Sequence, residues 1–392
     1  MRAFILLAVS SLGLAADIYV SPSGSSSGTG TQTNPFNSIQ SGINRAVAGD
    51  TIYLRGGTYS PTTNIQITKS GTSSAPYTLR AYGTERVIID GEALPYTPAE
   101  VGGSIPGASR GILHIERANW WRFYDLTLTN GPYGIYHVNS NNNLYERIVT
   151  HSNYESGFQL QGASSNNRIL YLDSYRNRDP RKNGESADGI GIKEGSGTGN
   201  VLIGARLWEN VDDGLDFWEF GSAITVQNTI AWGNGVNRWN FPDFQGDGNG
   251  FKLGGGDHAG TPAHIITNCI AFQNAAKGFT DNGQRGSFTL SGNTAWKNGD
   301  VGFQLRASTS RVTNNVAVNN AGTSTHSSQV SFSGSHTISG NSWQDSTVWR
   351  DGTFQSTSTN LVMGARQANG KIVPSNFLLP NNGRTIGATT VW

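Results

Sequence analysis

The chain has 392 residues, with 28 basic and 27 acidic side chains and a formal net charge of +1 at pH 7. Removal of a predicted leader at residues 1–16, which contains one arginine, leaves 27 residues of each sign. This balance excludes a protein-wide field that draws the chain to nucleic acid or anionic lipid, so affinity for an acidic polymer must come from a local site. The single cysteine, Cys269, excludes an intramolecular disulfide, and a large regular core must supply the stability.

Residues 1–16 combine one basic residue, an apolar run and small residues at Ala15 and Ala16. This pattern is typical of a secretory signal peptide, and the run is too short to span a membrane. No later stretch of the sequence is long and apolar enough to do so. We therefore expect a secreted, extracellular protein whose mature chain, residues 17–392, forms one domain and acts as a monomer, with neither a membrane nor nucleic acid as a partner.

Residues 35–47 are predicted to form a helix, because Phe36, Ile39, Ile43 and Val47 lie on one face at helical spacing. We expect this helix to cap the N-terminal end of a repeat array that occupies most of the remaining chain. The ends of a repeat array otherwise expose apolar side chains and unpaired strand edges. Residues 49–54 are predicted to begin the first strands.

Two short motifs alternate along residues 134–320 with a common period. The first motif consists of alanine, a bulky apolar residue, any residue and asparagine. Its strict and looser copies end at Asn153, Asn177, Asn210, Asn234, Asn274, Asn298 and Asn320. The second begins with glycine, at Gly134, Gly157, Gly189, Gly214, Gly250, Gly278 and Gly302. The shortest steps between copies are 22 to 25 residues, the length of one coil of a three-stranded solenoid. The repeat therefore predicts an all-β fold, a right-handed parallel β-helix.

The glycine motif also predicts which side chains face the core. The first position after each glycine is apolar in every copy and the third is mostly apolar. Because side chains alternate faces along a strand, these two positions face inward and the one between them faces out. The asparagines are predicted to form a structural ladder of amide hydrogen bonds between coils. After Asn341 the period fades, and we expect the tail to pack along the outside or over the last coil.

The repeat is interrupted twice. The next glycine normally lies four positions after a ladder asparagine, but Gly189 lies twelve positions after Asn177 and Gly250 sixteen after Asn234. Insertions in a solenoid form loops on one face, commonly the binding face. The two loops flank the coil that begins at Gly214 and predict a cleft centred on it.

The coil between the insertions carries Asp212, Asp213 and Asp216. Registering the coils on their glycines places Asp188 beside Asp213, on strands about 4.8 Å apart. Carboxylates held this close repel one another unless a cation joins them. Calcium takes six to eight oxygen ligands in irregular geometry, so we predict a calcium site at these four aspartates. The alternative interpretation is a set of solvated turn aspartates.

Lys252 lies in the same register as Asp216 on the next coil with a glycine motif. An outward lysine on a strand can simply be surface charge. Beside a bound divalent cation, however, its ammonium form is disfavoured. The pKa then falls from about 10.4 towards the range in which the amine serves as a base.

At these residues the chain resembles the pectate lyases of the ninth polysaccharide lyase family. The resemblance is most specific in the segments Asp212–Asp216 (DDGLD) and Gly248–Gly255 (GNGFKLGG). It implies a calcium-dependent β-helix enzyme with Lys252 as catalytic base and with Asp188, Asp212, Asp213 and Asp216 as calcium ligands. The implied reaction is β-elimination in 4-linked galacturonan, so the partner is an acidic plant cell-wall polysaccharide. A rhamnogalacturonan lyase of the same fold is an alternative.

The insertions also contain candidate substrate-binding residues. These are the basic residues Arg176, Arg178, Arg181, Lys182 and Arg238 and the aromatic residues Trp239 and Phe241. Each can instead be a solvated cation or an anchor of its own loop. Two other classes of protein also remain open. One is an inverting glycoside hydrolase with Asp212 and Asp213 as acid and base, which leaves Lys252 without a role. The other is a non-catalytic carbohydrate-binding protein.

Overall fold

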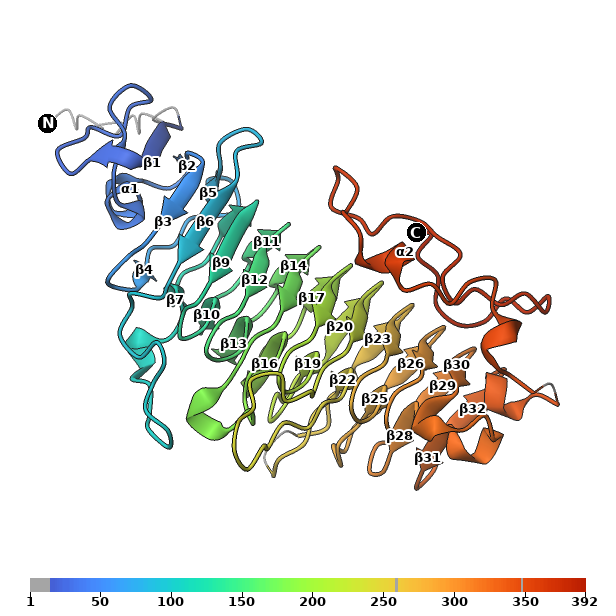
Figure 1. Cartoon of the computed structure of the whole chain (residues 1–392). Helices are drawn as coiled ribbons and strands as arrows, with labels where there is room; N and C mark the ends of the chain where they lie inside the picture. The colour runs from blue at the N-terminus through green and yellow to red at the C-terminus, as the bar shows by residue number, and fades with distance from the viewer. Residues whose placement is uncertain (1–14, 258–259, 347) are drawn as a thin grey trace, which may run out of the picture.

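The computed structural model describes residues 15–257, 260–346 and 348–392, so the predicted signal peptide lies outside it except for its last two residues. The strands of this part of the chain form three parallel sheets, and successive strands pass from one sheet to the next (Figure 1). This is the predicted parallel β-helix. Within the described ranges no helix is long and apolar enough to cross a membrane.

Each sheet is a ladder of strands stacked in order along the solenoid. Sheet A contains β1 (Asp17–Ser25), β2 (Thr51–Leu54), β5 (Tyr77–Ala81), β8 (Trp121–Tyr124), β11 (Leu144–Glu146), β14 (Arg168–Leu170), β17 (Asn200–Ile203), β20 (Ile224–Gln227), β23 (Ile265–Thr267), β26 (Thr289–Ser291), β29 (Arg311–Thr313) and β32 (Thr337–Ser339). Sheet B contains β4 (Ile65–Ile67), β7 (Leu113–Glu116), β10 (Ile135–Val138), β13 (Phe158–Ala163), β16 (Ile190–Ser196), β19 (Leu215–Asp216), β22 (Phe251–Lys252), β25 (Phe279–Thr280), β28 (Phe303–Leu305) and β31 (Val330–Phe332). Sheet C contains β3 (Gly57–Tyr59), β6 (Val87–Asp90), β9 (Leu126–Thr129), β12 (Val149–His151), β15 (Asp173–Tyr175), β18 (Arg206–Trp208), β21 (Ile230–Trp232), β24 (Ile270–Phe272), β27 (Thr294–Trp296) and β30 (Val316–Val318).

The helices of the described chain are short. They are α1 (Ile39–Arg45), α2 (Asn360–Met363) and the 3-10 turns η1 (Gly107–Ser109), η2 (Pro180–Lys182), η3 (Asn320–Gly322), η4 (His326–Ser328), η5 (Ser342–Gln344) and η6 (Asp351–Thr353). The predicted capping helix is present at the N-terminal end (Figure 1), with Ile39 and Ile43 buried in the core.

Two predictions at the N-terminal end were wrong in detail. The helix ends before Val47, which is 61% exposed, because the Val47 amide donates to the Asp50 carboxylate rather than to a helical carbonyl. The first strand is β1 rather than residues 49–54, and it lies beside β2 in parallel register.

The repeated glycine of each coil is required by the close approach of neighbouring backbones. A Cβ atom on Gly214 would lie 2.6 Å from the carbonyl oxygen of Gly250, and one on Gly250 would lie 2.8 Å from that of Gly278. These distances are too short for any side chain. The glycines therefore fix the register of sheet B, in which Phe251 pairs with Phe279 and their rings stack with centroids 4.6 Å apart.

Both predicted inward columns are buried, including their two polar members. The ring of His137 lies 2.7 Å from the Tyr145 hydroxyl and 2.8 Å from the Ser140 carbonyl oxygen. The Asp281 carboxylate accepts three backbone amides, from residues 306–308. These polar groups are tolerated in the core because each is hydrogen-bonded.

The predicted asparagine ladder is confirmed. Each Nδ2 donates to the Oδ1 of the next asparagine over distances of 2.8–3.0 Å, from Asn153 to Asn320. A second ladder at another corner of the coils was not predicted, and it includes the bonds Asn293–Asn315 and Asn315–Asn341 at 3.0 Å. The tail after residue 348 packs along the outside of sheet C, as predicted, where the Phe377 ring meets that of Phe272.

Candidate active site

A cleft of about 550 Å³ lies over the outer face of sheet B. Its walls come from three loops, 91–112, 178–188 and 235–249, which contribute Arg110, Arg181 and Gln245 respectively. The loops support one another, since the Gly102 amide donates to the Arg181 carbonyl at 2.8 Å and the Gln245 amide to that of Asn183 at 3.0 Å. The second and third loops are the predicted insertions. The first was missed because it precedes the part of the sequence in which the repeat is recognisable.

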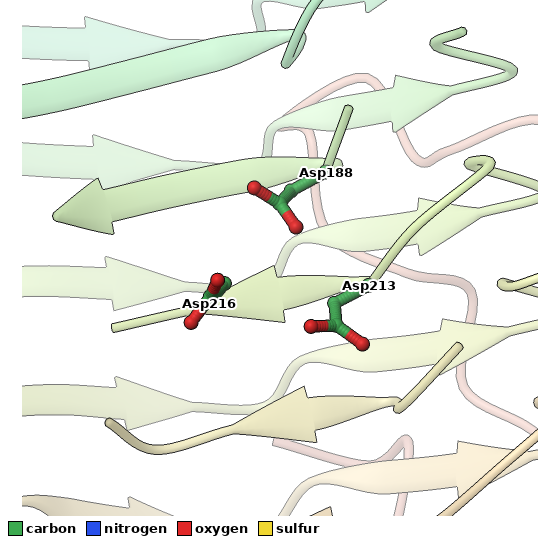
Figure 2. Close-up of side chains that lie close together, drawn as sticks. All are labelled: Asp188, Asp213 and Asp216. Carbon is green, nitrogen blue, oxygen red and sulfur yellow. The ribbon is translucent and has the colours of Figure 1, made fainter. Parts of the chain in front are cut away.

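Asp188, Asp213 and Asp216 meet at the floor of this cleft. Asp188 and Asp213 directly precede the glycines that begin neighbouring coils, and Asp216 is the last residue of β19. One oxygen of each carboxylate lies within 4.8 Å of the others, and all three residues are buried. Figure 2 shows the three side chains close together, with Asp188 on one coil and Asp213 and Asp216 on the next. The structure thus places these three aspartates as the glycine register predicted.

Asp212 adjoins this compact group, and the charges of Asp213, Asp188 and Lys252 act on its carboxyl group. It belongs to a second, overlapping group with Asp213 and Asp247. Its Oδ1 accepts the Asp247 amide at 2.7 Å, which turns the carboxylate towards the loop 235–249. Asp247 was not predicted, because its position depends on the path of an insertion that has no repeat.

The acidic residues have the properties of a metal site. Asp188 Oδ1, Asp212 Oδ2 and Asp213 Oδ2 are buried and have no hydrogen-bond partner among the described residues. A buried carboxylate oxygen without a partner is costly, and a bound cation removes that cost. Burial raises the pKa of Asp188 to about 6 and that of Asp213 to about 7. A ligand set made only of oxygens suits a hard cation such as calcium or magnesium.

Lys252 reaches into both acidic groups. Its Nζ lies 2.8 Å from Asp247, 3.3 Å from Asp213 and 3.4 Å from Asp216. Asp216 and Lys252 are register partners on β19 and β22, as predicted. Burial acts to lower the pKa of Lys252, but the surrounding carboxylates raise it well above its usual value. The pKa of Lys252 can therefore fall, as expected beside a cation, only when these carboxylates bind another group.

Lys193 is a second lysine of the site and was not predicted. Its Nζ lies 2.8 Å from Asp188 and 2.7 Å from Asp216. The sequence could have indicated this lysine. Lys193 lies four residues after Gly189, so it shares the outward face of β16 with the residue that pairs with Asp216. Lys193 and Lys252 hold the pKa of Asp216 below its usual value despite burial.

Most of the predicted substrate-binding residues lie outside the lining of the cleft. Arg176 and Arg238 both face Glu209, at 2.6 Å and 3.9 Å. Arg178 lies over the ring of Tyr154, at 4.1 Å from its centroid. Arg176 directly follows β15 of sheet C, which directs this segment away from the outer face of sheet B.

The remaining candidates differ in position. Trp239 stacks on Phe241 with centroids 6.2 Å apart, and neither lines the cleft. Arg181 does line the cleft, but its Nε lies 2.5 Å from buried Glu155, which already neutralises its charge. Lys182 also lines the cleft and pairs with Glu185 at 3.2 Å.

Comparisons with known proteins agree with the repeat and the acidic motif. The family model described as "Pel9A-like, right handed beta helix region" matches residues 18–329. Pectate lyase PEL9 of Emericella nidulans is 59% identical over 399 residues, which cover 97% of this chain and 96% of the relative.

Two solved structures have the same fold. The crystal structure of pectate lyase Pel9A matches with a TM-score of 0.78 and 31% identity, over 95% of this chain and 91% of its own. A rhamnogalacturonan lyase matches with a TM-score of 0.77 and 25% identity, over 94% and 97%. These matches confirm the right-handed parallel β-helix, and the chain belongs to the Pel9A-like β-helix family.

Proposed function

We propose that this protein is a pectate lyase that cleaves 4-linked galacturonan by β-elimination, with calcium as cofactor and Lys252 as base. The observation that carries the proposal is the buried acidic cluster on the cleft floor, with three carboxylate oxygens that accept no hydrogen bond from the described residues and with the Lys252 amine beside them. The family supports the reaction class, since relatives with well-matched sequences are pectate lyases.

Asp188, Asp213 and Asp216 would hold the calcium ion, and Asp212 has a buried free oxygen adjacent to them. Bound there, the ion supplies electrophilic stabilisation of the uronate carboxylate, on which negative charge builds as the neighbouring proton leaves. The three aspartates and Lys252 are buried at the floor of the cleft, and burial strengthens the electrostatic interactions among them.

In this proposal, Lys252 takes the proton from C5 of the sugar at its Nζ. The C5–H bonding electrons form the C4–C5 double bond, and the glycosidic oxygen departs from C4 with its own bonding pair. The amine must first be neutral. Asp213, Asp216 and Asp247 favour the ammonium form, so neutralisation of these carboxylates is a condition for activity.

A hydrolase is less compatible with the site. Oxygens of Asp212 and Asp213 lie within 4.8 Å, whereas inverting glycosidases hold their two carboxyl groups about 6.5–9.5 Å apart to admit a water. A rhamnogalacturonan lyase is the second candidate, and the similarity to such an enzyme at 25% identity favours testing it. We further propose that residues 1–16 are a signal peptide and that the mature enzyme acts outside the cell as a monomer.

One set of assays tests these proposals together. Polygalacturonate and rhamnogalacturonan are each incubated with the protein, with and without a chelator, and the ultraviolet absorbance of the unsaturated product is followed. We expect product from polygalacturonate only, loss of activity with chelator, and better recovery with calcium than with magnesium, which requires stricter octahedral geometry.

Each alternative has its own outcome in these assays. New reducing ends without ultraviolet absorbance indicate a hydrolase, and preferential turnover of rhamnogalacturonan indicates the second lyase. Full activity after exhaustive chelation contradicts the calcium proposal, and binding without product indicates a non-catalytic protein.

A further inference from the structure

Arg110, at the end of the loop 91–112, differs from the other cations of the cleft. Five basic residues line it, namely Arg110, Arg181, Lys182, Lys193 and Lys252. Four of them form ion pairs with carboxylates of the protein. Among the described residues, Arg110 forms none, so its charge is available to a ligand in the cleft.

The guanidinium of Arg110 is nevertheless held in place. Its Nε donates to the Ile105 carbonyl at 3.2 Å, and Nη1 donates to the Tyr136 hydroxyl at 3.1 Å. The guanidinium carbon also lies over the Tyr136 ring, 5.4 Å from its centroid. Nη2 makes no hydrogen bond within the described chain. A fixed fork with free donors in a cleft is the arrangement that recognises carboxylate.

The carboxylates near this part of the cleft either accept hydrogen bonds from other residues or lie apart from Arg110. Glu194 lines the cleft and accepts from Nε2 of Gln161, whose Oε1 in turn accepts the Tyr136 hydroxyl. It forms no ion pair with Arg110. The network thus orients Tyr136 towards Arg110, and Glu194 acts on the guanidinium through its charge at longer range, without an ion pair.

The strand register gives the separation between Tyr136, which Arg110 contacts, and the acidic cluster. Tyr136 of β10 lies on the same outward face of sheet B as Asp216 of β19, three strands further along. Neighbouring strands are about 4.8 Å apart, so this separation is about 14 Å. A polysaccharide along the solenoid axis, across the strands labelled β10 to β19 in Figure 1, crosses both positions.

We propose that Arg110 binds a uronate carboxylate of the substrate, several sugars away from the bond that is cleaved. It is thus a residue that determines specificity for long chains with free carboxylates. This inference rests on the proposed lyase activity, because a galacturonan carries one carboxylate on each sugar. A disaccharide at the acidic cluster is too short to reach the guanidinium, whereas a decasaccharide reaches it.

The test uses Arg110→Gln, Arg110→Lys and, as a matched control, Arg168→Gln on the exposed face of β14. Each change is combined with Lys252→Met to prevent turnover. Dissociation constants are measured by calorimetry, with calcium, for digalacturonate and decagalacturonate. We expect Arg110→Gln to weaken binding of the decasaccharide about 10- to 100-fold, as for loss of a charged hydrogen bond, and to leave the disaccharide unchanged. Arg110→Lys should restore part of the loss, and Arg168→Gln should bind like the parent.

Equal effects of Arg110→Gln on both ligands, or no effect on the decasaccharide, would overturn the proposal. A purely structural role of Arg110 is detected by Arg110→Lys, since a disturbed loop weakens both ligands and is not rescued by charge. Turnover of polygalacturonate by the unmodified protein is measured first. If the unmodified protein forms no unsaturated product, the lyase proposal fails. If it forms product but Arg110→Gln binds the decasaccharide as the parent does, only the Arg110 proposal fails.

Discussion

Calcium affinity should fall steeply with acidity, because protons and calcium compete for the same buried carboxylates. The raised pKa values, about 7 for Asp213 and about 6 for Asp188, describe the metal-free cluster, which therefore holds protons that calcium must displace. For each carboxyl group that must lose a proton, calcium affinity falls about tenfold for every pH unit below the pKa of that group. Between about pH 8 and about pH 5 these interacting carboxylates take up protons as a set, and the loss of affinity should lie between about 10-fold and about 1000-fold. The raised pKa of Asp212 acts in the same direction.

Calorimetric titration with calcium across this pH range measures the effect, and buffers with different ionisation heats count the protons released. Asp213→Asn should bind more weakly at alkaline pH and should lose the part of the pH dependence that belongs to that residue. Asp300→Asn is a suitable control, since Asp300 pairs with Lys277 outside the cleft lining. Affinity that changes less than about threefold between the two limits would refute the assignment of these carboxylates as ligands.

Two further predictions concern the base and the ladder. Lys252→Arg should lower turnover of polygalacturonate by about 10²–10⁴ at every pH, because guanidinium stays protonated, while calcium affinity by calorimetry stays within a few-fold. The unmodified enzyme should gain activity towards alkaline pH, and an arginine variant that keeps most of the rate would assign Lys252 to substrate binding alone. Asn274→Ala removes the hydrogen bonds to Asn298, Asn234 and the Ala231 carbonyl, and should lower the free energy of urea unfolding by about 1–3 kcal/mol with near-normal turnover of the folded fraction. Lost turnover with an unchanged melting temperature would contradict its structural role.

The architecture could be predicted because one local constraint recurs in every coil. A glycine is needed wherever two backbones approach, as at Gly214, and its recurrence fixes the register of sheet B. Register then determines which side chains are neighbours, so the pairing of Asp216 with Lys252 followed from sequence positions alone. The same reasoning could have found Lys193, which lies on the outward face of β16.

Loop geometry could not be predicted in this way. Asp247 and Arg110 lie in insertions without a repeat, so their sequence positions contain no register. For the same reason, Arg176 and Arg238 were predicted to bind substrate because they lie in or beside an insertion, yet both face Glu209. Membership of an insertion does not determine which face of the solenoid a side chain occupies. That depends on the sheet from which the chain leaves.

The charge of the site supports the proposed metal, because the ion pairs of the described residues leave it negative. Four buried aspartates, Asp188, Asp212, Asp213 and Asp216, and the more exposed Asp247 share only two lysines, so full ionisation leaves three negative charges uncompensated. Without a cation, the cluster can reduce this charge only by binding protons, and burial, aided by repulsion from neighbouring aspartates, raises the pKa of Asp188 and Asp213 in that direction. In the proposed function, a divalent cation would offset two of these charges and release those protons. It would also weaken the hold of the carboxylates on Lys252, so the charge deficit that attracts a cation would be the same one that keeps the lysine protonated until the cation is bound.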